Sequence, residues 1–522
     1  MRGRRPRAQP RSRRPARNRP GHADSHRGAG ALAVSITRVA VVGGGISGLT
    51  TAYRLRTLLG SAVEIEIIEG SRRLGGALRT VELGGVALDV GAEAFLVRRP
   101  EAVELIEELG LGAQLRHPTS AAPTVRAEGR TVPLPTRTML GLPGAAADVA
   151  DLLSAQGTAR VAAEPTMPLR WEAGRDAAVG LLLRERAGDE LVDRLVDPLL
   201  GGVYAGRADA LGLRATLPAV ATALDRGAGS LLAAACVALT AGRRPTGGGP
   251  VFGTLSGGFE RLVDALVAGS AVHPRLGRPV RGLARTPHGW RLELGPTGEG
   301  EQLDVDAVVL AVPAPALRRL LADPLPAASA AASRVEVASS AVVGLALPWI
   351  AAQALPESSG VLVAASGPQE KTLSVKAFTF SGRKWAHARS AEVVLVRASM
   401  GRHGEARVLQ RDDAELVDAV RADLAALTGI TATPVATVVA RWGGGLPQYA
   451  PGHLDAVAVL EREIAGSAGL AVAGATLHGV GLPACIGTAN TAARRIVGYL
   501  NNRWASHAAR GDVAVPGGTM GP

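Results

Sequence analysis

The sequence predicts an α/β fold, α+β overall, in which a domain built on a parallel sheet is interleaved with a lobe built on a mixed or antiparallel sheet and with a helical insertion. Three observations predict it. Residues 38–55 pass from a strand through a glycine-rich turn into a helix, residues 100–232 have a mostly helical rhythm, and residues 337–441 alternate short apolar strands. With 522 residues, the chain also exceeds the size at which one hydrophobic core stops growing.

The positive charge of the chain is concentrated in its amino-terminal tail. The formal net charge is +12, and residues 1–30 hold ten arginines against a single acid. This segment is rich in Pro and Gly and has no apolar periodicity, so we expect residues 1–35 to be disordered. An RNA-binding arm, a membrane-binding arm, a transit-like segment or translation from an upstream start would each explain it. The remainder is close to charge balance, and we predict no nucleic-acid partner.

Cysteine content and hydropathy favour a reducing cytoplasm. Cys236 and Cys485 are the only cysteines and lie far apart, so neither a disulfide framework nor a thiolate metal site is predicted. Residues 337–356 form an uncharged stretch long enough to span a bilayer, but Pro348 interrupts it. We interpret this stretch as a buried strand and predict no transmembrane helix.

The glycine turn indicates a phosphate-binding corner. Residues 38–42 form a short apolar run typical of a strand buried on both faces, and a helical pattern follows the turn. Gly43, Gly45 and Gly48 form G-x-G-x-x-G: the first allows the tight turn, the second lets the backbone approach a diphosphate, and the third lets the helix pack on the strand. The helix N-terminus supplies unpaired N–H groups for the anion.

A second strand strengthens the prediction of a dinucleotide site. Residues 63–70 form this strand, and it ends in Glu69, 21 residues after Gly48. An acid at that place can accept hydrogen bonds from a ribose diol. The alternative is that Glu69 is a solvated acid at the end of a strand.

The stretch after Glu69 resembles the extended fingerprint of FAD-dependent amine oxidase-like flavoproteins. It reads SRRLGGALRT and contains the glycine pair Gly75 and Gly76 and the cation Arg79, which could face phosphate. The resemblance makes FAD the favoured cofactor. Residues 81–96 then alternate around Gly84 and Gly85, which predicts a β-hairpin.

Later segments complete the alternation of elements. Residues 306–321 read as a buried strand, a loop and a helix, which again suggests a doubly wound domain. Residues 339–347, 360–366, 373–380 and 391–399 read as strands of a substrate lobe. Residues 412–429 predict a helix that begins with acids and ends at Gly429.

Four motifs in the rest of the chain are similar to those of the protoporphyrinogen/coproporphyrinogen oxidase family of haem biosynthesis. Their order and spacing match that family over roughly residues 38–500. The motifs are DPLLGGVYAGRADALGLRATLP at 197–218, TLSGGFERL at 254–262, KAFTFSGRKWA at 376–386 and AGATLHGVGLPACIGTANTAARRIV at 473–497.

The resemblance implies a Rossmann-like FAD-binding domain and a set of cofactor contacts. In the family, the segment from Val480 through Gly481 and Leu482 to Pro483 lies against the flavin ring, and Val280 contacts adenine through its backbone. A glycine-rich loop aimed at a helix N-terminus suits the polar edge of a flavin. The predicted cofactor-binding residues are Gly43, Gly45, Ile46, Ser47, Gly48, Glu69, Gly75, Gly76, Arg79, Val280, Gly474, Val480, Gly481 and Leu482.

The resemblance also implies the reaction. FAD-dependent removal of six electrons would convert a porphyrinogen into a porphyrin, with dioxygen as acceptor and hydrogen peroxide as product. Some relatives carry Arg at the position of Glu93, so substrate anchoring by that Arg does not transfer. The GAEAF form resembles Gram-positive members, which favours coproporphyrinogen III, giving coproporphyrin III.

Cations near the flavin are expected to pair with the acidic side chains of such a substrate, since Arg presents a fork that matches a carboxylate. For each arginine the alternative is a solvated charge. His478 and Cys485 lie in the carboxyl-terminal loop, where either could be catalytic or could simply pack against its neighbours. We favour packing and assign no catalytic residue, because hydride transfer to a flavin needs orientation more than a nucleophile. No metal site is predicted. The predicted substrate-binding residues are Arg98, Arg99, Gly360, Val361, Leu362 and Arg397.

The elements divide into interleaved parts. The resemblance implies that the helical insertion forms a wall of the active site and a membrane-facing surface. The alternative is that its amphipathic helices are half-buried in their own domain, which gives the same pattern. The predicted parts are a disordered tail (1–35), FAD-binding segments (36–97, 233–325 and 453–503), the helical insertion (98–232), a substrate-binding domain (326–452) and a second disordered tail (504–522).

The sequence is compatible with three other functions. Protoporphyrinogen IX is the alternative substrate, and an amine oxidase or a carotenoid desaturase is a more remote alternative. An amine oxidase usually surrounds its flavin with aromatic side chains, and residues 475–486 contain none. We expect a monomer or homodimer in the cytoplasm with at most peripheral contact to the inner membrane face, and transfer of the product to a ferrochelatase.

Overall fold

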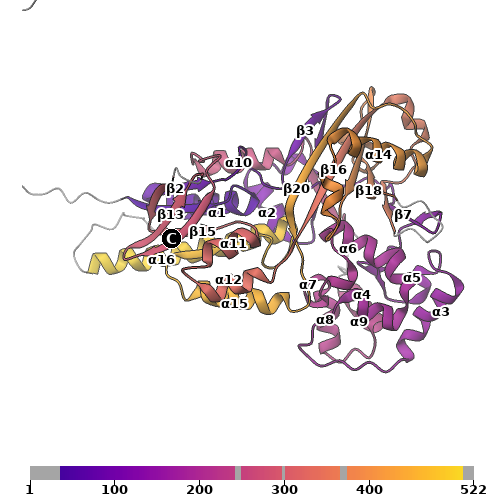
Figure 1. The fold of residues 1–522 in the computed structure, drawn as a ribbon, viewed down its shortest axis with the longest axis horizontal. Coiled ribbons are helices and arrows are strands. Elements are labelled where there is room, and N and C mark those ends of the chain that lie inside the picture. The colour runs from indigo at the N-terminus through magenta and orange to yellow at the C-terminus, as the bar shows by residue number, and fades with distance from the viewer. Residues whose placement is uncertain (1–35, 242–248, 297–299, 365–372, 510–522) are drawn as a thin grey trace, which may run out of the picture.

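The computed structural model describes residues 36–241, 249–296, 300–364 and 373–509. It has three parts: a parallel sheet between helices, a large twisted sheet, and a group of helices beside that sheet (Figure 1). The α/β fold class is confirmed. The predicted tail 1–35 and residues 510–522 lie outside the described residues.

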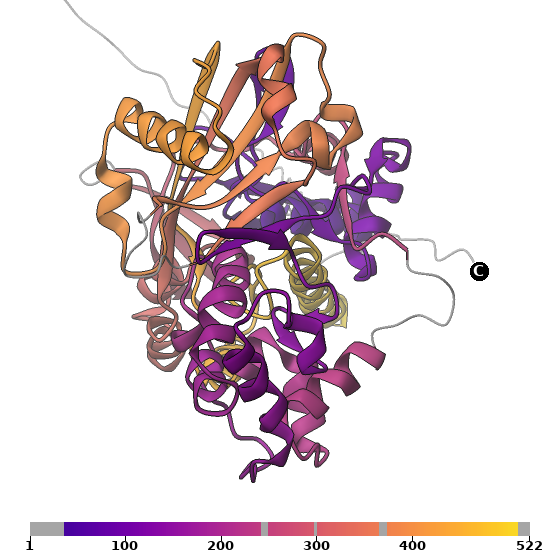
Figure 2. The same ribbon diagram turned by 90° about the vertical axis from the view of Figure 1, so that its right-hand side faces the viewer.

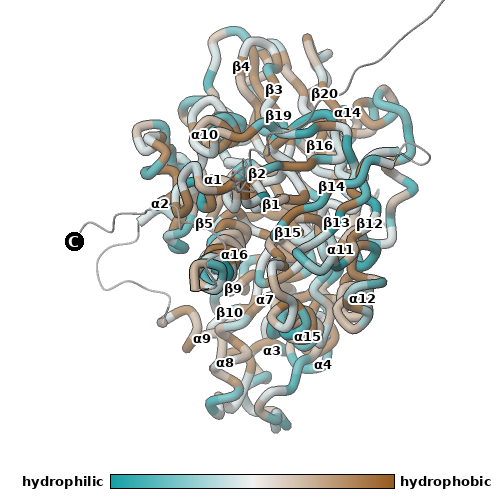
Figure 3. Tube along the Cα trace, turned by 90° about the vertical axis from the view of Figure 1, so that its left-hand side faces the viewer, coloured by the Kyte–Doolittle hydropathy of each residue, from teal (hydrophilic) through white to brown (hydrophobic). Residues whose placement is uncertain are grey.

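The first part is built on a four-stranded parallel sheet of order β2-β1-β15-β21. Its central strands are fully buried, as in Val39, Val41 and Val309, each 0% exposed. Figure 3 shows β1 and β15 as apolar segments of the chain. The strands are β1 (Thr37–Val42), β2 (Val63–Ile68), β15 (Ala307–Leu310) and β21 (Leu470–Val472).

Two layers cover the faces of this sheet. Val39 and Val41 point to a core shared by four helices, and Ala40 and Val42 point to the opposite core. The helices on the first face are α1 (Ile46–Leu59), α2 (Pro100–Glu108), α10 (Glu260–Ser270) and α16 (Leu482–Ala509). On the second face lie a three-stranded antiparallel sheet, β12 (Val280–Thr286), β13 (Gly289–Leu294) and β14 (Glu301–Val305), and helices α11 (Ala314–Leu321), α12 (Pro326–Ser333) and α15 (His453–Ala465).

A hairpin links this part to the large sheet. It consists of β3 (Thr80–Leu83) and β4 (Val86–Asp89), and Gly84 and Gly85 form its turn with positive φ angles, as the sequence predicts. At its end the Asp89 carboxylate accepts hydrogen bonds from Thr80 Oγ1 at 2.6 Å and from the Phe259 amide at 3.1 Å. Asp89 therefore anchors the hairpin to the start of α10.

The large sheet has seven strands in the order β20-β16-β19-β18-β17-β7-β8 and is antiparallel except where β17 pairs with β7. Helix α14 (Asp413–Thr428) covers one face. Its predicted limits are confirmed, because Asp412 and Glu415 form a capping box and Gly429 ends the helix with φ of 76°. The strands are β7 (Thr124–Ala127), β8 (Arg130–Pro133), β16 (Val337–Pro348), β17 (Gly360–Val363), β18 (Val375–Phe380), β19 (Val393–Met400) and β20 (Ala436–Pro447).

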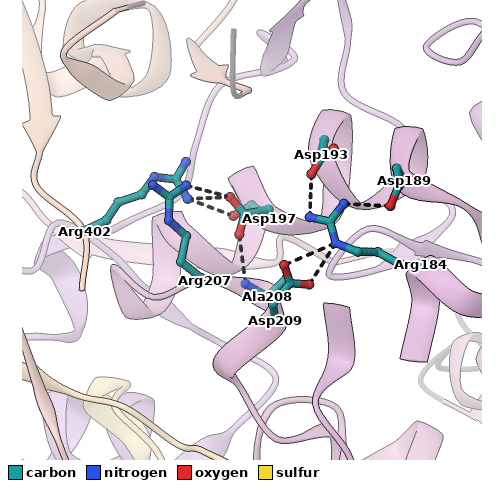
Figure 4. A network of polar contacts seen from close by, with 8 residues as sticks. All are labelled: Arg184, Asp189, Asp193, Asp197, Arg207, Ala208, Asp209 and Arg402. Carbon is teal, nitrogen blue, oxygen red and sulfur yellow. Dashed lines mark hydrogen bonds and ion pairs between the residues drawn. The ribbon is translucent and has the colours of Figure 1, made fainter. Parts of the chain in front are cut away.

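The helical part packs around its own core, below the large sheet in Figure 2. A buried ion pair of 2.7 Å joins Arg186 to Glu164, whose carboxylate also accepts the Leu231 amide. Figure 4 shows a second network, in which Arg184 bridges Asp189, Asp193 and Asp209. The helices are α3 (Ala155–Ala163), α4 (Val179–Ala187), α5 (Asp189–Leu191), α6 (Asp197–Tyr204), α7 (Leu213–Thr216), α8 (Pro218–Asp225) and α9 (Leu231–Ala241), and the short strands β9 (Thr138–Met139) and β10 (Leu142–Pro143) pair beside them.

The structure moves several predicted boundaries. The insertion 98–232 is not uniformly helical, because α2 joins the first core and β7 and β8 extend the large sheet. Helix α12 belongs to the parallel-sheet part, since Ala328 packs in its second core. Helix α16 continues to Ala509, beyond the predicted boundary, because the Trp504 indole donates to Thr37 Oγ1 at 3.1 Å. Two short strands, β5 (Phe95–Leu96) and β6 (Leu115–Arg116), flank β11 (Phe252–Leu255) in a further small sheet.

Within the described segments, every helix is too short or too polar to cross a membrane.

The buried Asp89 gives a prediction about stability and pH. Burial raises the pKa of Asp89 from 3.8 to about 6, and Glu93 adds to this, whereas Thr80, Phe259 and Arg397 act in the opposite direction. A folded-state pKa above the unfolded value means that stability is present below about pH 4 and is lost as the pH rises through about 6. Asp89→Asn keeps an acceptor oxygen without the charge.

We therefore expect Asp89→Asn to raise the thermal midpoint relative to wild type at about pH 8, with a free-energy gain on the order of 2 kcal/mol. The advantage should vanish near pH 4, where the wild-type carboxyl is protonated. Thermal unfolding at both pH values checks this, and an equal difference at both would contradict it.

Candidate cofactor and substrate site

The loops that follow the four parallel strands meet at one edge of the sheet, because parallel strands bring their carboxyl ends together. Backbone hydrogen bonds tie these loops: Gly43 N donates to Ile68 O at 2.8 Å, Ala311 N to Val42 O at 2.8 Å, and Ala473 N to Leu310 O at 3.0 Å. This edge therefore gathers segments that are hundreds of residues apart in sequence.

The three glycines of the G-x-G-x-x-G motif have two kinds of surroundings: Gly43 and Gly48 are tightly packed, and Gly45 is open. A Cβ on Gly43 would lie 2.3 Å from Ala311 O, and one on Gly48 only 1.8 Å from Gly43 O, so the turn and the helix contact require glycine. A Cβ on Gly45 would meet only Gly76 Cα at 3.8 Å. Gly45 also caps α1 without a side-chain hydrogen bond, so an open position lies before a helix N-terminus, which suits a diphosphate.

Glu69 fixes the geometry of this corner. Its carboxylate accepts the Gly44 amide and the Ser71 amide, both at 2.7 Å, and retains further lone pairs for a ribose diol. The segment before β12 lies alongside, since Glu69 N donates to Arg275 O at 2.9 Å. Val280 begins β12, and its carbonyl accepts a hydrogen bond from Arg319 at 3.0 Å.

The second glycine pair lies against the first. Gly75 and Gly76 have positive φ angles, and Gly75 N donates to Gly44 O at 2.8 Å. The Arg73 guanidinium donates to the carbonyls of Leu74, Gly76 and Leu78 and so holds the loop. This function of Arg73 was not predicted, although the Arg72–Arg73 pair before the glycines is a visible signal in the sequence.

Arg79 lies close enough to Arg73 to act on its charge. Burial lowers the pKa of Arg73, and the Arg79 cation lowers it further. In the described part of the chain the Arg79 guanidinium makes no hydrogen bond, so it remains available for a phosphate.

The carboxyl-terminal loop closes the site beside α1. Gly474 has φ of 122°, its amide donates to Thr488 Oγ1 at 3.0 Å, and Ser47 Oγ donates to Cys485 O at 3.3 Å. The N-termini of α1 and α16, which begin at Ile46 and Leu482, thus lie side by side. Gly481 has nothing nearer to a built Cβ than Pro483 Cδ at 3.8 Å, and Val480 packs against the helical core.

Two stacked rings, Tyr449 and His453, hold this loop in position. The Tyr449 and His453 rings stack at 3.9 Å, Tyr449 Oη donates to Ala475 O, and His453 Nε2 lies 2.9 Å from Leu477 O. The four-residue spacing of Tyr and His in QYAPGH is the signal in the sequence from which this pair could have been predicted. These two rings set the position of the loop rather than its chemistry.

Neither His478 nor Cys485 has the environment of a nucleophile. The His478 ring lies 2.7 Å from Glu461, and this hydrogen bond raises its pKa. Burial raises the pKa of Cys485 to about 11, so its thiol stays protonated at neutral pH.

Of the two arginines after the hairpin, Arg99 lies near the loop that precedes α16. Arg98 is exposed and makes no ion pair or hydrogen bond among the described residues. Arg99 is 46% exposed, lies 3.7 Å from Glu101, and is 3.8 Å from a Cβ built on Gly479. Both cations are accessible, and Arg99 borders the loop that precedes α16.

The structure gives Glu93 a partner set that the sequence did not reveal. Its carboxylate accepts the Trp385 indole at 2.7 Å and lies 3.2 Å from Lys384 and 3.7 Å from Arg397. Burial acts to raise the pKa of Glu93, but Lys384, Arg397 and Trp385 outweigh it and lower the pKa. A charged Glu93 therefore ties the hairpin to the large sheet.

Arg397 is largely occupied by the backbone. It donates to Asp89 O at 3.1 Å and to Gly91 O at 2.7 Å, so its main contacts position the hairpin. A propionate contact from Arg397 stays a prediction.

The β17 residues are divided between the two faces of the large sheet. Val361 packs into the core under α14, whereas Leu362 contacts the helical core. A Cβ on Gly360 would lie 2.3 Å from Phe378 O, so glycine is required for strand packing there. Of these three predicted substrate neighbours, Leu362 is the one whose side chain faces the helical part.

A family model described as flavin containing amine oxidoreductase matches residues 46–497. The coproporphyrinogen III oxidase of Mycobacterium tuberculosis is 44% identical over 461 residues, 88% of this chain and 97% of that protein. The Bacillus subtilis protein of the same name is 29% identical and covers 88% and 98%.

Solved structures agree on the fold. A putative protoporphyrinogen oxidase from Exiguobacterium sp. 255-15 superposes with a TM-score of 0.76 at 30% identity, covering 88% of this chain and 99% of that one. Cyclohexylamine oxidase from Brevibacterium oxydans has a TM-score of 0.64 at 16% identity, which supports the fold alone. The glycine cradle, the closing carboxyl-terminal loop and these matches together place the chain in the flavin-containing amine oxidoreductase family, with FAD as its cofactor.

Proposed function

We propose that this chain oxidises coproporphyrinogen III to coproporphyrin III with FAD and dioxygen, releasing hydrogen peroxide. The observation that carries the proposal is its similarity, over nearly the whole length, to relatives named coproporphyrinogen III oxidase. Protoporphyrinogen IX is the second candidate substrate, because the solved relative is titled a putative protoporphyrinogen oxidase.

In this proposal the protein binds FAD and the substrate, orients them toward each other and excludes water from the site. FAD, when bound, supplies the hydride acceptor and the reaction with dioxygen. Gly43, Gly45 and the α1 N-terminus would hold the diphosphate, Glu69 the ribose, and the loop at Val480 the flavin ring. Holding a bridging carbon of the macrocycle against the flavin supplies catalysis through orientation, so a protein nucleophile is unnecessary.

The substrate carries carboxylates, and accessible cations would bind them. Arg98 and Arg99 are proposed to pair with propionates at the mouth of the site, since guanidinium forks match carboxylates. Support comes from the position of Arg99 beside Gly479.

The proposal also covers where the protein acts and what it binds. Exposed apolar side chains on the helical part, Leu181, Val203 and Val237, would suit peripheral contact with a membrane on the cytoplasmic side. We further propose that the protein is a monomer or a homodimer and that it transfers its product to a ferrochelatase.

A methyl group at Gly45 tests the cofactor cradle. Since a Cβ there meets nothing closer than Gly76 Cα at 3.8 Å, Gly45→Ala should fold as the wild type does. The methyl group would occupy the path of the diphosphate, so we expect at least a tenfold weaker FAD affinity, about 1.4 kcal/mol. Flavin absorbance after purification, and titration of the FAD-free protein, measure this.

Gly498→Ala is the matched control, because a Cβ at Gly498 on α16 has no heavy atom within 4 Å. It should bind FAD like wild type. Equal FAD affinity in Gly45→Ala and wild type would contradict the placement of the diphosphate.

The proposed reaction is tested by comparing substrates. The FAD-loaded protein should turn over coproporphyrinogen III with a higher kcat/KM than protoporphyrinogen IX, because more carboxylates meet its cations. Porphyrin fluorescence follows both reactions in steady state. A preference for protoporphyrinogen IX would select the second candidate, and oxidation of an amine instead would end the proposal.

A further inference from the structure

Lys376 on β18 is a buried cation without a partner. Its side chain is only 7% exposed. Across residues 36–241, 249–296, 300–364 and 373–509, no acceptor takes a hydrogen bond from its ammonium group, whereas Lys384 is paired with Glu93 at 3.2 Å. Burying an unpaired ammonium destabilises a protein, so such a group points to a ligand that supplies the missing anion.

The charged neighbours of Lys376 are mostly cations. Arg402 and Arg397 lie close enough to repel its charge, and the one carboxylate that acts on it, Glu405, is itself ion-paired with Arg207. Burial and the two guanidinium groups lower the pKa of Lys376 to about 7. An incoming carboxylate would favour the protonated ammonium and remove the repulsion.

The neighbouring carboxylate Asp197 is already occupied. Figure 4 shows Arg402 and Arg207 converging on it, at 2.8 Å and 3.5 Å, while the Ala208 amide donates to its other oxygen at 2.8 Å. This network fixes α6 against the segment that follows β19. It leaves the positive charge of Lys376 uncompensated.

Lys376 lies next to the part of the large sheet that faces the helical part. Its neighbour Ala377 pairs with Leu362 on β17, and α6 packs against β17 and β18. The register of β18 against β19 shifts between Val375 and Ala377, and this β-bulge at Lys376 interrupts the alternation that would otherwise turn Lys376 to the opposite face from Ala377. Glycines on α6 allow this approach: a Cβ on Gly201 would lie 2.5 Å from Arg402 Nη1, and one on Gly202 lies 3.7 Å from Leu362 Cδ2. The ammonium and a predicted substrate neighbour thus share one corner, on elements different from those of Arg98 and Arg99.

We propose that Lys376 is a substrate-positioning residue that binds one carboxylate side chain of a polycarboxylate macrocycle at the corner between α6 and the large sheet. This inference rests on the proposed function and deepens it. The macrocycle is then held at two separate points, by Arg99 beside Gly479 and by Lys376 on the sheet. A substrate with few carboxylates would lose one of these anchors.

The test compares wild type with Lys376→Met on coproporphyrinogen III and on its tetramethyl ester, which carries no free carboxylate. Loss of a charge-assisted hydrogen bond should raise KM for the free acid about tenfold or more, with a smaller change in kcat. KM for the ester should not change. Lys376→Arg keeps the charge and should restore most of the affinity. Arg421→Met on α14, whose half-buried side chain pairs with Asp418, controls for loss of one positive charge.

The melting temperature of the variant shows whether Lys376 binds substrate or only stabilises the fold. Met has nearly the volume of the Lys stem and needs no partner, so substrate-free Lys376→Met should melt at or above the wild-type temperature. A lower melting temperature, an unchanged KM for the free acid, or an equal rise for acid and ester would each overturn the inference. If wild type oxidises neither porphyrinogen, the proposed function itself has failed, which is a different result.

Discussion

The structure depends on the absence of side chains at one corner of the parallel sheet. Gly43 and Gly48 let β1, α1 and the loop after β15 come within a distance at which any Cβ would collide with a carbonyl oxygen. Gly45 leaves open the position in front of the helix N-terminus, where unpaired N–H groups favour an anion. The same corner receives Glu69, the second glycine pair and the end of β21, so cofactor binding and domain folding share one set of contacts.

The substrate side is held in place by charge as much as by packing. Glu93 joins the hairpin to Lys384, Trp385 and Arg397, and Asp197 joins α6 to Arg402 and Arg207. These partly buried pairs fix the relative positions of the hairpin, the large sheet and α6. Removing one partner would leave an uncompensated charge, so their main value here is positioning.

Local patterns in the sequence predicted the elements whose cause is local. The glycine turn, the hairpin at Gly84 and Gly85, and the capped helix ending at Gly429 follow from backbone conformation and hydrogen bonds within a few residues. The strands β7 and β8 were missed because β7 pairs with β17, more than two hundred residues away, and nothing in their own four-residue pattern reveals it. Arg73, Tyr449 and Lys376 were missed for the same reason, since their roles depend on carbonyls, rings and charges brought near by the fold.

The most direct test of the account is an anaerobic titration of the FAD-loaded protein with coproporphyrinogen III. If the glycine corner holds FAD with its ring beside the substrate, the visible flavin absorbance falls as porphyrin fluorescence rises. Admission of dioxygen then restores the flavin absorbance. A flavin that stays oxidised in the presence of excess porphyrinogen, or a folded protein that retains no FAD, would contradict the account.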